Sequence, residues 1–139
     1  MCRRAWWCKA EVVSLRCLIV DDDVRFGSVL QGVLERQGIS VVATATSTQE
    51  AIRLAEELAP DFALVDIGLG EESGFELTEH LYADPGPTLN VILISTRSHD
   101  DFADLIEASP AVGFLPKSEL SAHAIYDLLA GRNGSSRAS

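Results

Sequence analysis

Residues 62–74 read FALVDIGLGEESG, an apolar run that ends in Asp66 and passes into a turn rich in glycine and acids. A short run that is apolar at nearly every position is typical of a strand covered on both faces of a sheet. The glycines that follow mark the end of the strand, because tight turns favour them. We therefore expect Asp66 at the carboxyl end of a buried strand.

Three other apolar runs end in side chains suited to the same chemistry. CLIV ends in Asp21 and Asp22, VILI ends in Ser95, and GFLP ends in Lys117. If the runs are parallel strands, their carboxyl ends share the edge of the sheet at which such sheets bind ligands. Carboxylates about 4 Å apart repel by roughly 4 kcal/mol at an effective dielectric of about 20, so the cluster needs a cation. Mg²⁺ is the default expectation for oxygen ligands.

Amphipathic segments separate the apolar runs. We expect strands at 16–20, 40–45, 62–66, 90–95 and 112–115, and helices at 24–37, 47–58, 74–82, 100–108 and 118–130. The alternation of strands and helices favours an α/β fold. The prediction is a (βα)5 doubly wound parallel sheet with the flavodoxin-like strand order 2-1-3-4-5.

Single polar residues mark the beginnings of several expected helices. Short oxygen-bearing side chains at these places accept a hydrogen bond from the first turn of the helix. The expected caps are Asp23, Ser47 (in a capping box with Glu50) and Ser118. The acids Glu71 and Glu72 are expected to form only a solvated loop.

The chain has 139 residues, the size of one domain, and its hydrophobic content of 47% is ordinary for a globular protein. We divide it into an N-terminal extension, 1–14, a domain, 15–130, and a flexible tail, 131–139. The net charge is −10, of which residues 1–16 carry +3 and the remainder −13. An acidic domain repels phosphates, so no direct nucleic-acid partner is expected.

Cysteine usage and hydropathy bear on the compartment. The three cysteines are Cys2, Cys8 and Cys17, an odd number that argues against a disulfide framework. No apolar stretch approaches the roughly 20 residues that span a bilayer. Arg3 and Arg4 are not followed by the apolar region of an export signal. A cytoplasmic protein without a membrane partner is expected.

Four segments together resemble the receiver (CheY-like) domain of bacterial two-component response regulators. They are IVDDD, LVDIGLGEESG, ILIST and GFLPKSEL, in the order and approximate spacing of that family. The resemblance covers about residues 15–130. It implies that Asp66 is the phosphoacceptor, and it implies Mg²⁺ as cofactor. The implied metal ligands are Asp21, Asp22, Asp66 and the backbone carbonyl of Gly68, with Asp22 favoured as the direct ligand of the acidic pair.

The resemblance also implies residues that bind the phosphoryl group and respond to it. They are Ser95, Thr96, Phe114 and Lys117. Ser95 takes the place of the switch hydroxyl, Phe114 that of the aromatic residue that turns inward with it, and Lys117 that of the phosphate-binding lysine. Gly74, eight residues after Asp66, matches a glycine of the family's loop.

Several positions depart from the family's common pattern. Gly70 stands where proline is frequent, so a looser loop is expected after Asp66. Ser118 stands where proline often follows the lysine in a cis peptide, and a cis bond before a non-proline residue costs about 3 kcal/mol. Thr96 is larger than the usual residue, and Gly68 has no side chain to position water. We predict slow autodephosphorylation.

The resemblance implies a single-domain response regulator that takes a phosphoryl group from a histidine kinase or a phosphotransfer protein. A downstream protein would read the face made by the fourth helix, the fifth strand and the fifth helix, and a homodimer is left open. Such a protein is not an enzyme beyond self-phosphorylation from small donors and autodephosphorylation. Three alternatives stay open: an adaptor that works without phosphorylation, the receiver half of a two-domain transcriptional regulator, and, more weakly, a small hydrolase.

Overall fold

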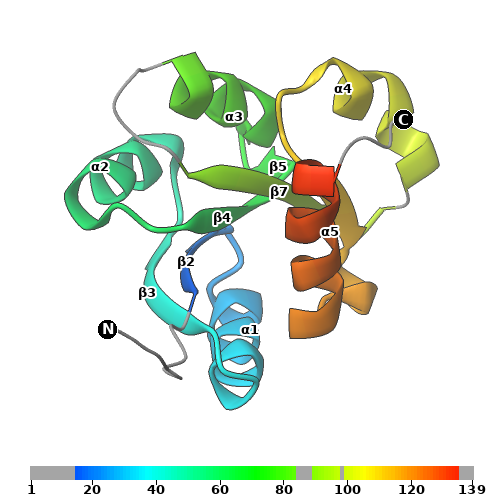
Figure 1. Ribbon diagram of the computed structural model, residues 1–139. Helices are drawn as coiled ribbons and strands as arrows, with labels where there is room; N and C mark the ends of the chain where they lie inside the picture. Colours follow the sequence, from blue (N-terminus) through cyan, green and yellow to red (C-terminus); the bar gives the residue numbers. More distant parts are fainter. Residues whose placement is uncertain (1–14, 84–88, 98, 135–139) are drawn as a thin grey trace.

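A computed structural model describes residues 15–83, 89–97 and 99–134. Five parallel strands form one sheet in the order β3-β2-β4-β7-β8 (Figure 1), which is the predicted order 2-1-3-4-5. The strands are β2 (Arg16–Val20), β3 (Ser40–Ala45), β4 (Phe62–Asp66), β7 (Asn90–Ser95) and β8 (Gly113–Pro116). The doubly wound α/β fold is confirmed.

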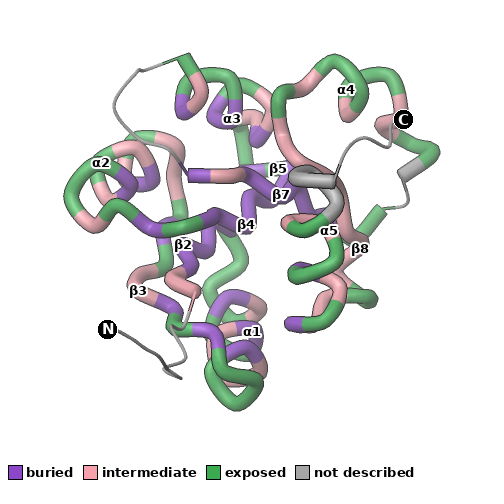
Figure 2. The backbone as a smooth tube through the Cα atoms, in the orientation of Figure 1, coloured by how far each residue is buried: buried purple, intermediate pink, exposed green. Residues whose placement is uncertain are grey.

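Helices cover both faces of the sheet, as Figure 1 shows. They are α1 (Val24–Arg36), α2 (Thr48–Leu58), α3 (Gly74–Ala83), α4 (Ala103–Ala108) and α5 (Ala122–Gly134). One hydrophobic cluster lies between the sheet and α2 and α3, and a second lies between the sheet and α1 and α5. Burial is concentrated on the central strands β2, β4 and β7 (Figure 2), and β4 is buried at all five positions. This explains why its sequence is apolar without alternation.

Strand register aligns the carboxyl ends of the sheet. Val20 of β2 pairs with Val65 of β4, so the residues that follow, Asp21 and Asp66, leave the sheet at the same level. Asp66 in turn pairs with Ile94 of β7, which precedes Ser95. Backbone pairing alone therefore brings these polar residues to one edge.

Helix beginnings follow the predicted caps at two places. The Asp23 carboxylate accepts a hydrogen bond from Phe26 N at 3.2 Å, and Ser47 Oγ accepts one from Glu50 N at 3.2 Å. In return, Glu50 Oε1 accepts a hydrogen bond from Thr46 N at 3.0 Å. In a capping box this donor is the cap residue itself, here Ser47, so the donor lies one residue earlier than expected. Both caps are confirmed.

The beginning of the last helix was predicted wrongly. Ser118 lies in a short 3-10 turn, η2 (Lys117–Glu119), and α5 begins only at Ala122. Ser121 Oγ accepts from Ala124 N at 3.1 Å, so Ser121 takes the capping role. The helix also extends to Gly134, past the expected end near residue 130. A second 3-10 turn, η1 (His99–Phe102), replaces the first turn expected of the fourth helix.

The turn after Asp66 holds a small hairpin that the sequence did not predict. β5 (Gly68–Leu69) pairs antiparallel with β6 (Glu72–Ser73). Gly70 closes it with a φ of +65°, a conformation that favours glycine. The loop expected to be loose is thus held by backbone pairing.

Some predictions fall partly outside the described residues. The extension 1–14, with Cys2 and Cys8, and residues 135–139 lie there. Cys17 is buried in β2 as a free thiol, and burial raises its pKa above the usual range. Across the part of the chain that the structure describes, no helix is long and apolar enough to cross a membrane.

Candidate functional site

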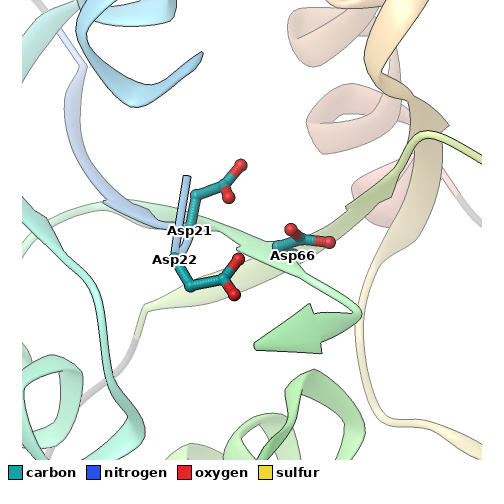
Figure 3. A group of neighbouring side chains, drawn as sticks. All are labelled: Asp21, Asp22 and Asp66. Atoms are coloured by element: carbon teal, nitrogen blue, oxygen red, sulfur yellow. The ribbon is translucent and has the colours of Figure 1, made fainter. Parts of the chain in front are cut away.

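Three carboxylates meet at the carboxyl edge of the sheet. Asp21 and Asp22 follow β2, and Asp66 ends β4; Figure 3 shows the three side chains next to one another at these strand ends. Each offers an oxygen atom within 4.8 Å of those of the others. Asp21 and Asp66 are only 3% and 8% exposed, whereas Asp22 is open to solvent. The predicted convergence of these side chains is therefore present.

Lys117 bridges two of these acids from the end of β8. Its Nζ lies 2.7 Å from Asp21 Oδ2 and 3.1 Å from Asp66 Oδ2. Burial by itself lowers the pKa of Lys117, but the contacts with Asp21 and Asp66 outweigh burial and raise it. Lys117 therefore remains charged at neutral pH, and the long side chain spans the distance from β8 as the sequence predicted.

The balance of charge leaves the cluster acidic. The pKa of the Asp66 carboxyl is raised from 3.8 to about 6, mainly by burial and further by the charge of Asp21, while Lys117 opposes both. One ammonium facing three carboxylates leaves two negative charges when all are ionised. A divalent cation is the natural complement, and hard carboxylate oxygens are the ligands that Mg²⁺ prefers. The residues present fit that ion.

Backbone contacts hold the acids in place. Asp21 Oδ1 accepts from Asp23 N at 2.9 Å, and Asp66 Oδ1 accepts from Gly68 N at 3.1 Å. The second contact keeps the backbone of Gly68 beside the Asp66 carboxylate, where its carbonyl was expected to act as a ligand. At Gly74, a Cβ atom would collide with the carbonyl oxygen of Asp66, so only glycine permits this close approach.

Of the other predicted residues, Ser95 and Thr96 line a cavity with Asp66, and Phe114 packs in a hydrophobic cluster. Ser95 is buried at the end of β7, and its Oγ accepts from Arg97 N at 3.0 Å. A cavity of about 480 Å³ is lined by Asp66, Ser95 and the exposed Thr96, among others. Phe114 is half-buried against the cluster under α2 and α3. The roles of Ser95, Thr96 and Phe114 in switching, and the slow autodephosphorylation, stay predictions.

The peptide after the lysine is trans. The described residues contain no cis peptide bond, and these include Lys117 and Ser118. The 3-10 turn that begins at Lys117 accommodates a trans bond and still directs the ammonium to Asp21 and Asp66.

Two residues near the site were not predicted to take part. The Phe26 ring centroid lies 4.4 Å from Lys117 Nζ. Glu72, expected to be solvated, accepts a hydrogen bond from Thr48 N at 2.8 Å and ties the hairpin to the start of α2. This contact lowers the pKa of Glu72. No local sequence signal indicates either contact, because each joins distant segments.

Comparisons with known proteins agree with the geometry. The sequence profile of the response regulator receiver domain matches residues 17–128. Transcriptional regulatory protein LiaR of Bacillus subtilis is 30% identical over 121 residues, which are 86% of this chain and 57% of that protein. Response regulator GacA of Pseudomonas aeruginosa is 28% identical over 123 residues, 85% of this chain and 56% of that protein. The chain thus spans little more than half the length of these curated relatives.

Solved structures show the same fold. A two-component response regulator of the LuxR family from Aurantimonas sp. SI85-9A1 has a TM-score of 0.76 and 29% identity, over 86% of this chain and 87% of that one. A CheY-like receiver domain protein from Methanospirillum hungatei JF-1 has a TM-score of 0.68 over 86% of this chain and 94% of that one. Its identity of 23% supports a likeness of fold alone.

Proposed function

Because the chain belongs to the response regulator receiver domain family, we propose that it accepts a phosphoryl group on Asp66 and thereby switches a partner-binding face. One observation carries the proposal. The Asp66 carboxylate is almost buried, yet it lies between two further acids and the Lys117 ammonium, at the edge where such sheets bind ligands. A carboxylate beside cations can act as a nucleophile toward phosphorus.

The proposed ligands of Mg²⁺ are Asp21, Asp22, Asp66 and the backbone carbonyl of Gly68. When bound, the ion would supply positive charge to the phosphoryl oxygens during transfer. The remaining contacts to the phosphoryl oxygens are proposed to come from the Lys117 ammonium, which lies 3.1 Å from Asp66 Oδ2, and from the Ser95 hydroxyl, which lines the same cavity as Asp66.

In the proposed transfer, an oxygen of Asp66 attacks the phosphorus atom of the donor. A new P–O bond forms to Asp66, and the bond to the leaving group breaks, with the electron pair going to the leaving group. The expected physiological donor is a phosphohistidine of a sensor kinase or a phosphotransfer protein, whose imidazole leaves. With acetyl phosphate, acetate leaves. The product is an acyl phosphate on Asp66, and no external substrate is turned over.

The added charge is expected to act on the face made by α4, β8 and α5. Phosphorylation brings strong acceptor oxygens that Ser95 and Lys117 can bind, and their movement would repack Phe114 in β8. The two helices carry exposed apolar side chains, Leu105 in α4 and Tyr126 in α5, at 54% and 41% exposure. A protein partner is proposed to read the repacked face.

Intact mass measurement tests the proposal. Incubation with acetyl phosphate and Mg²⁺ is expected to add one phosphoryl group to the wild-type chain, and chelation of Mg²⁺ should prevent the addition. Asp66→Asn should block it, whereas Asp61→Asn, a matched change at the opposite end of β4, should not. An unmodified wild-type mass would contradict the proposal and favour an adaptor that works without phosphorylation.

The coverage of the relatives supports a second candidate, the receiver half of a two-domain transcriptional regulator. LiaR and GacA are each matched over little more than half of their length. In that case the face of α4, β8 and α5 would contact a second domain of the same protein. The complete gene region, read for an output domain in frame, distinguishes this candidate from a single-domain regulator.

A further inference from the structure

A closed ring of contacts joins the acidic run to Lys117. Asp21 Oδ1 accepts from Asp23 N, and Asp23 Oδ1 accepts from Phe26 N. The Phe26 ring lies 4.4 Å from Lys117 Nζ, and the same Nζ lies 2.7 Å from Asp21 Oδ2, where the ring of contacts closes. Asp21 therefore contacts Lys117 directly and, through Asp23, also helps to fix the backbone of Phe26.

The ring is a third partner for an ammonium that has three N–H donors. Asp21 and Asp66 are the other two partners, at 2.7 and 3.1 Å. An aromatic face attracts a cation through its quadrupole, most strongly where water is excluded, and the side chain of Lys117 is only 10% exposed. A ring adds no negative charge, so it stabilises the ammonium without competing with Asp66.

We propose that Phe26 is a positioning residue that holds the Lys117 ammonium at the Asp66 carboxylate for phosphoryl transfer. The inference rests on the proposed function. A lysine side chain has a flexible four-carbon stem and many rotamers, so a fixed ammonium needs contacts that select one of them. An ammonium already in place at the start of transfer requires no rearrangement as charge moves onto the phosphoryl oxygens.

Packing alone is the competing explanation, because Phe26 also contacts the hydrophobic cluster under α1 and α5. The two roles make different demands on the side chain. Packing needs an apolar group of similar volume, which leucine supplies. Positioning needs an aromatic face, which tyrosine keeps and leucine lacks.

The test compares initial rates of phosphorylation by acetyl phosphate at saturating Mg²⁺, followed by intact mass. In this reaction the P–O bond to acetate breaks and a P–O bond to Asp66 forms. Phe26→Leu is expected to be slower by about fivefold, the scale of a partly desolvated cation–π contact, while Phe26→Tyr stays near the wild-type rate. Phe62→Leu is the matched control: it makes the same change in the same cluster, at the far end of β4, and should lower stability but not the rate.

A double-mutant cycle tests whether Phe26 acts through Lys117. In a Lys117→Ala background, Phe26→Leu should have no further effect on the rate, because the cation that the ring holds is gone. Thermal unfolding of every variant checks folding, and Phe26→Met replaces Phe26→Leu if the latter does not fold.

The outcomes separate the two proposals. If the wild-type chain takes no phosphoryl group, the proposed function fails. If it is phosphorylated and Phe26→Leu (or Phe26→Met) reacts as fast as wild type, the positioning role is overturned. The positioning role is also overturned if Phe26→Leu slows phosphorylation equally in the wild-type and Lys117→Ala backgrounds. The same conclusion follows if Phe26→Tyr is as slow as Phe26→Leu.

Discussion

Asp66 shares the Lys117 ammonium with Asp21 and has only 8% of its surface exposed, and its pKa is raised to about 6. Burial causes most of the rise and the Asp21 charge adds to it, so ionised Asp66 lowers the stability of the fold at neutral pH. A buried carboxylate that destabilises the fold when it is ionised is expected at a functional site. This destabilisation also offers a way to test the electrostatics independently of phosphorylation.

Asp66→Asn is expected to raise the free energy of unfolding at pH 7 without Mg²⁺ by about 1 kcal/mol, after allowance for solvent screening. The sign follows from proton binding. Between the unfolded pKa of 3.8 and the folded value of about 6, the folded wild-type chain holds more protons than the unfolded chain, so it loses stability as pH rises. The extra free energy of unfolding of Asp66→Asn over wild type should therefore be complete above pH 6 and vanish below about pH 4. Urea unfolding across this range measures it, and a gain that grows toward acid pH would contradict the assignment.

In the presence of Mg²⁺, the wild-type chain should instead be more stable than Asp66→Asn. An ion that binds only the folded state stabilises it by mass action, and the wild-type chain would offer the ion one more negatively charged carboxylate than Asp66→Asn. Urea unfolding in a Mg²⁺ series measures this effect. Equal stabilisation of both chains by Mg²⁺ would argue against Asp66 as a ligand.

At the scale of elements, the hairpin of β5 and β6 connects the acid cluster to α2. Glu72 carries the connection through its hydrogen bond from Thr48 N, and Gly68 of the same hairpin stays beside Asp66. Residues that orient metal ligands typically change metal affinity by about 10–100-fold, and an exposed one should lie at the low end of that range. The hairpin thus takes over the restraint that a proline in this loop often provides.

Glu72→Gln is expected to weaken Mg²⁺ binding severalfold, as measured by isothermal titration calorimetry. Glu71→Gln, an exposed neighbour, is the control and should bind as wild type. Because the contact lowers the pKa of Glu72, its effect should be present above the ordinary glutamate pKa and disappear as pH falls through the lowered value. Identical Mg²⁺ affinities for the two variants would show that the tether does not support the site.

A pair of glycine substitutions tests the close approach of α3 to β4. Gly74→Ala should destabilise the fold by at least about 2 kcal/mol, because the new Cβ meets the backbone of Asp66 and Ile67. Gly27→Ala, in α1, meets nothing within 4 Å and should stabilise the fold by about 0.5–1 kcal/mol. Chemical denaturation measures both changes. Similar effects in the two variants would contradict this account of Gly74.

For the whole molecule, the sheet separates two hydrophobic clusters, and the site lies at the carboxyl edge of that sheet. Phe114 packs on the α2 and α3 side, whereas Leu115, the next residue of β8, packs on the α1 and α5 side. A shift of β8 would therefore change the packing on both faces of the sheet. This arrangement can carry a change at Asp66 to the surface that a partner is proposed to read.

Hydrogen exchange is expected to reveal that coupling. Phosphorylation with acetyl phosphate and Mg²⁺ should change amide exchange in α4, β8 and α5 and leave β3 and the middle of α2 unchanged. The Asp66→Asn chain under the same conditions is the control and should show no change in α4, β8 and α5. Changes spread evenly over the molecule, or their absence from β8, would contradict the proposed switch.

The sequence by itself determined the strands and, once the flavodoxin-like strand order was assumed, the convergence of Asp21, Asp22, Asp66 and Lys117. These follow from apolar runs and from the residues at their ends, since parallel pairing brings carboxyl ends together whatever the intervening helices contain. Capping at Asp23 and Ser47 was equally local, because the donor and acceptor lie within one helical turn.

Only the tertiary structure decided the contacts between segments far apart in the chain. The ring of Phe26 at Lys117, the bond from Thr48 to Glu72 and the bond from Ala122 N to Gln37 Oε1 at 2.6 Å each join separate elements. Local spacing could not predict them, because side-chain direction and the final angle between elements are fixed by packing. For the same reason α5 begins at Ala122 rather than at Ser118. Residues 117–119 form the 3-10 turn from which Lys117 reaches the acids, and the helix begins after this turn.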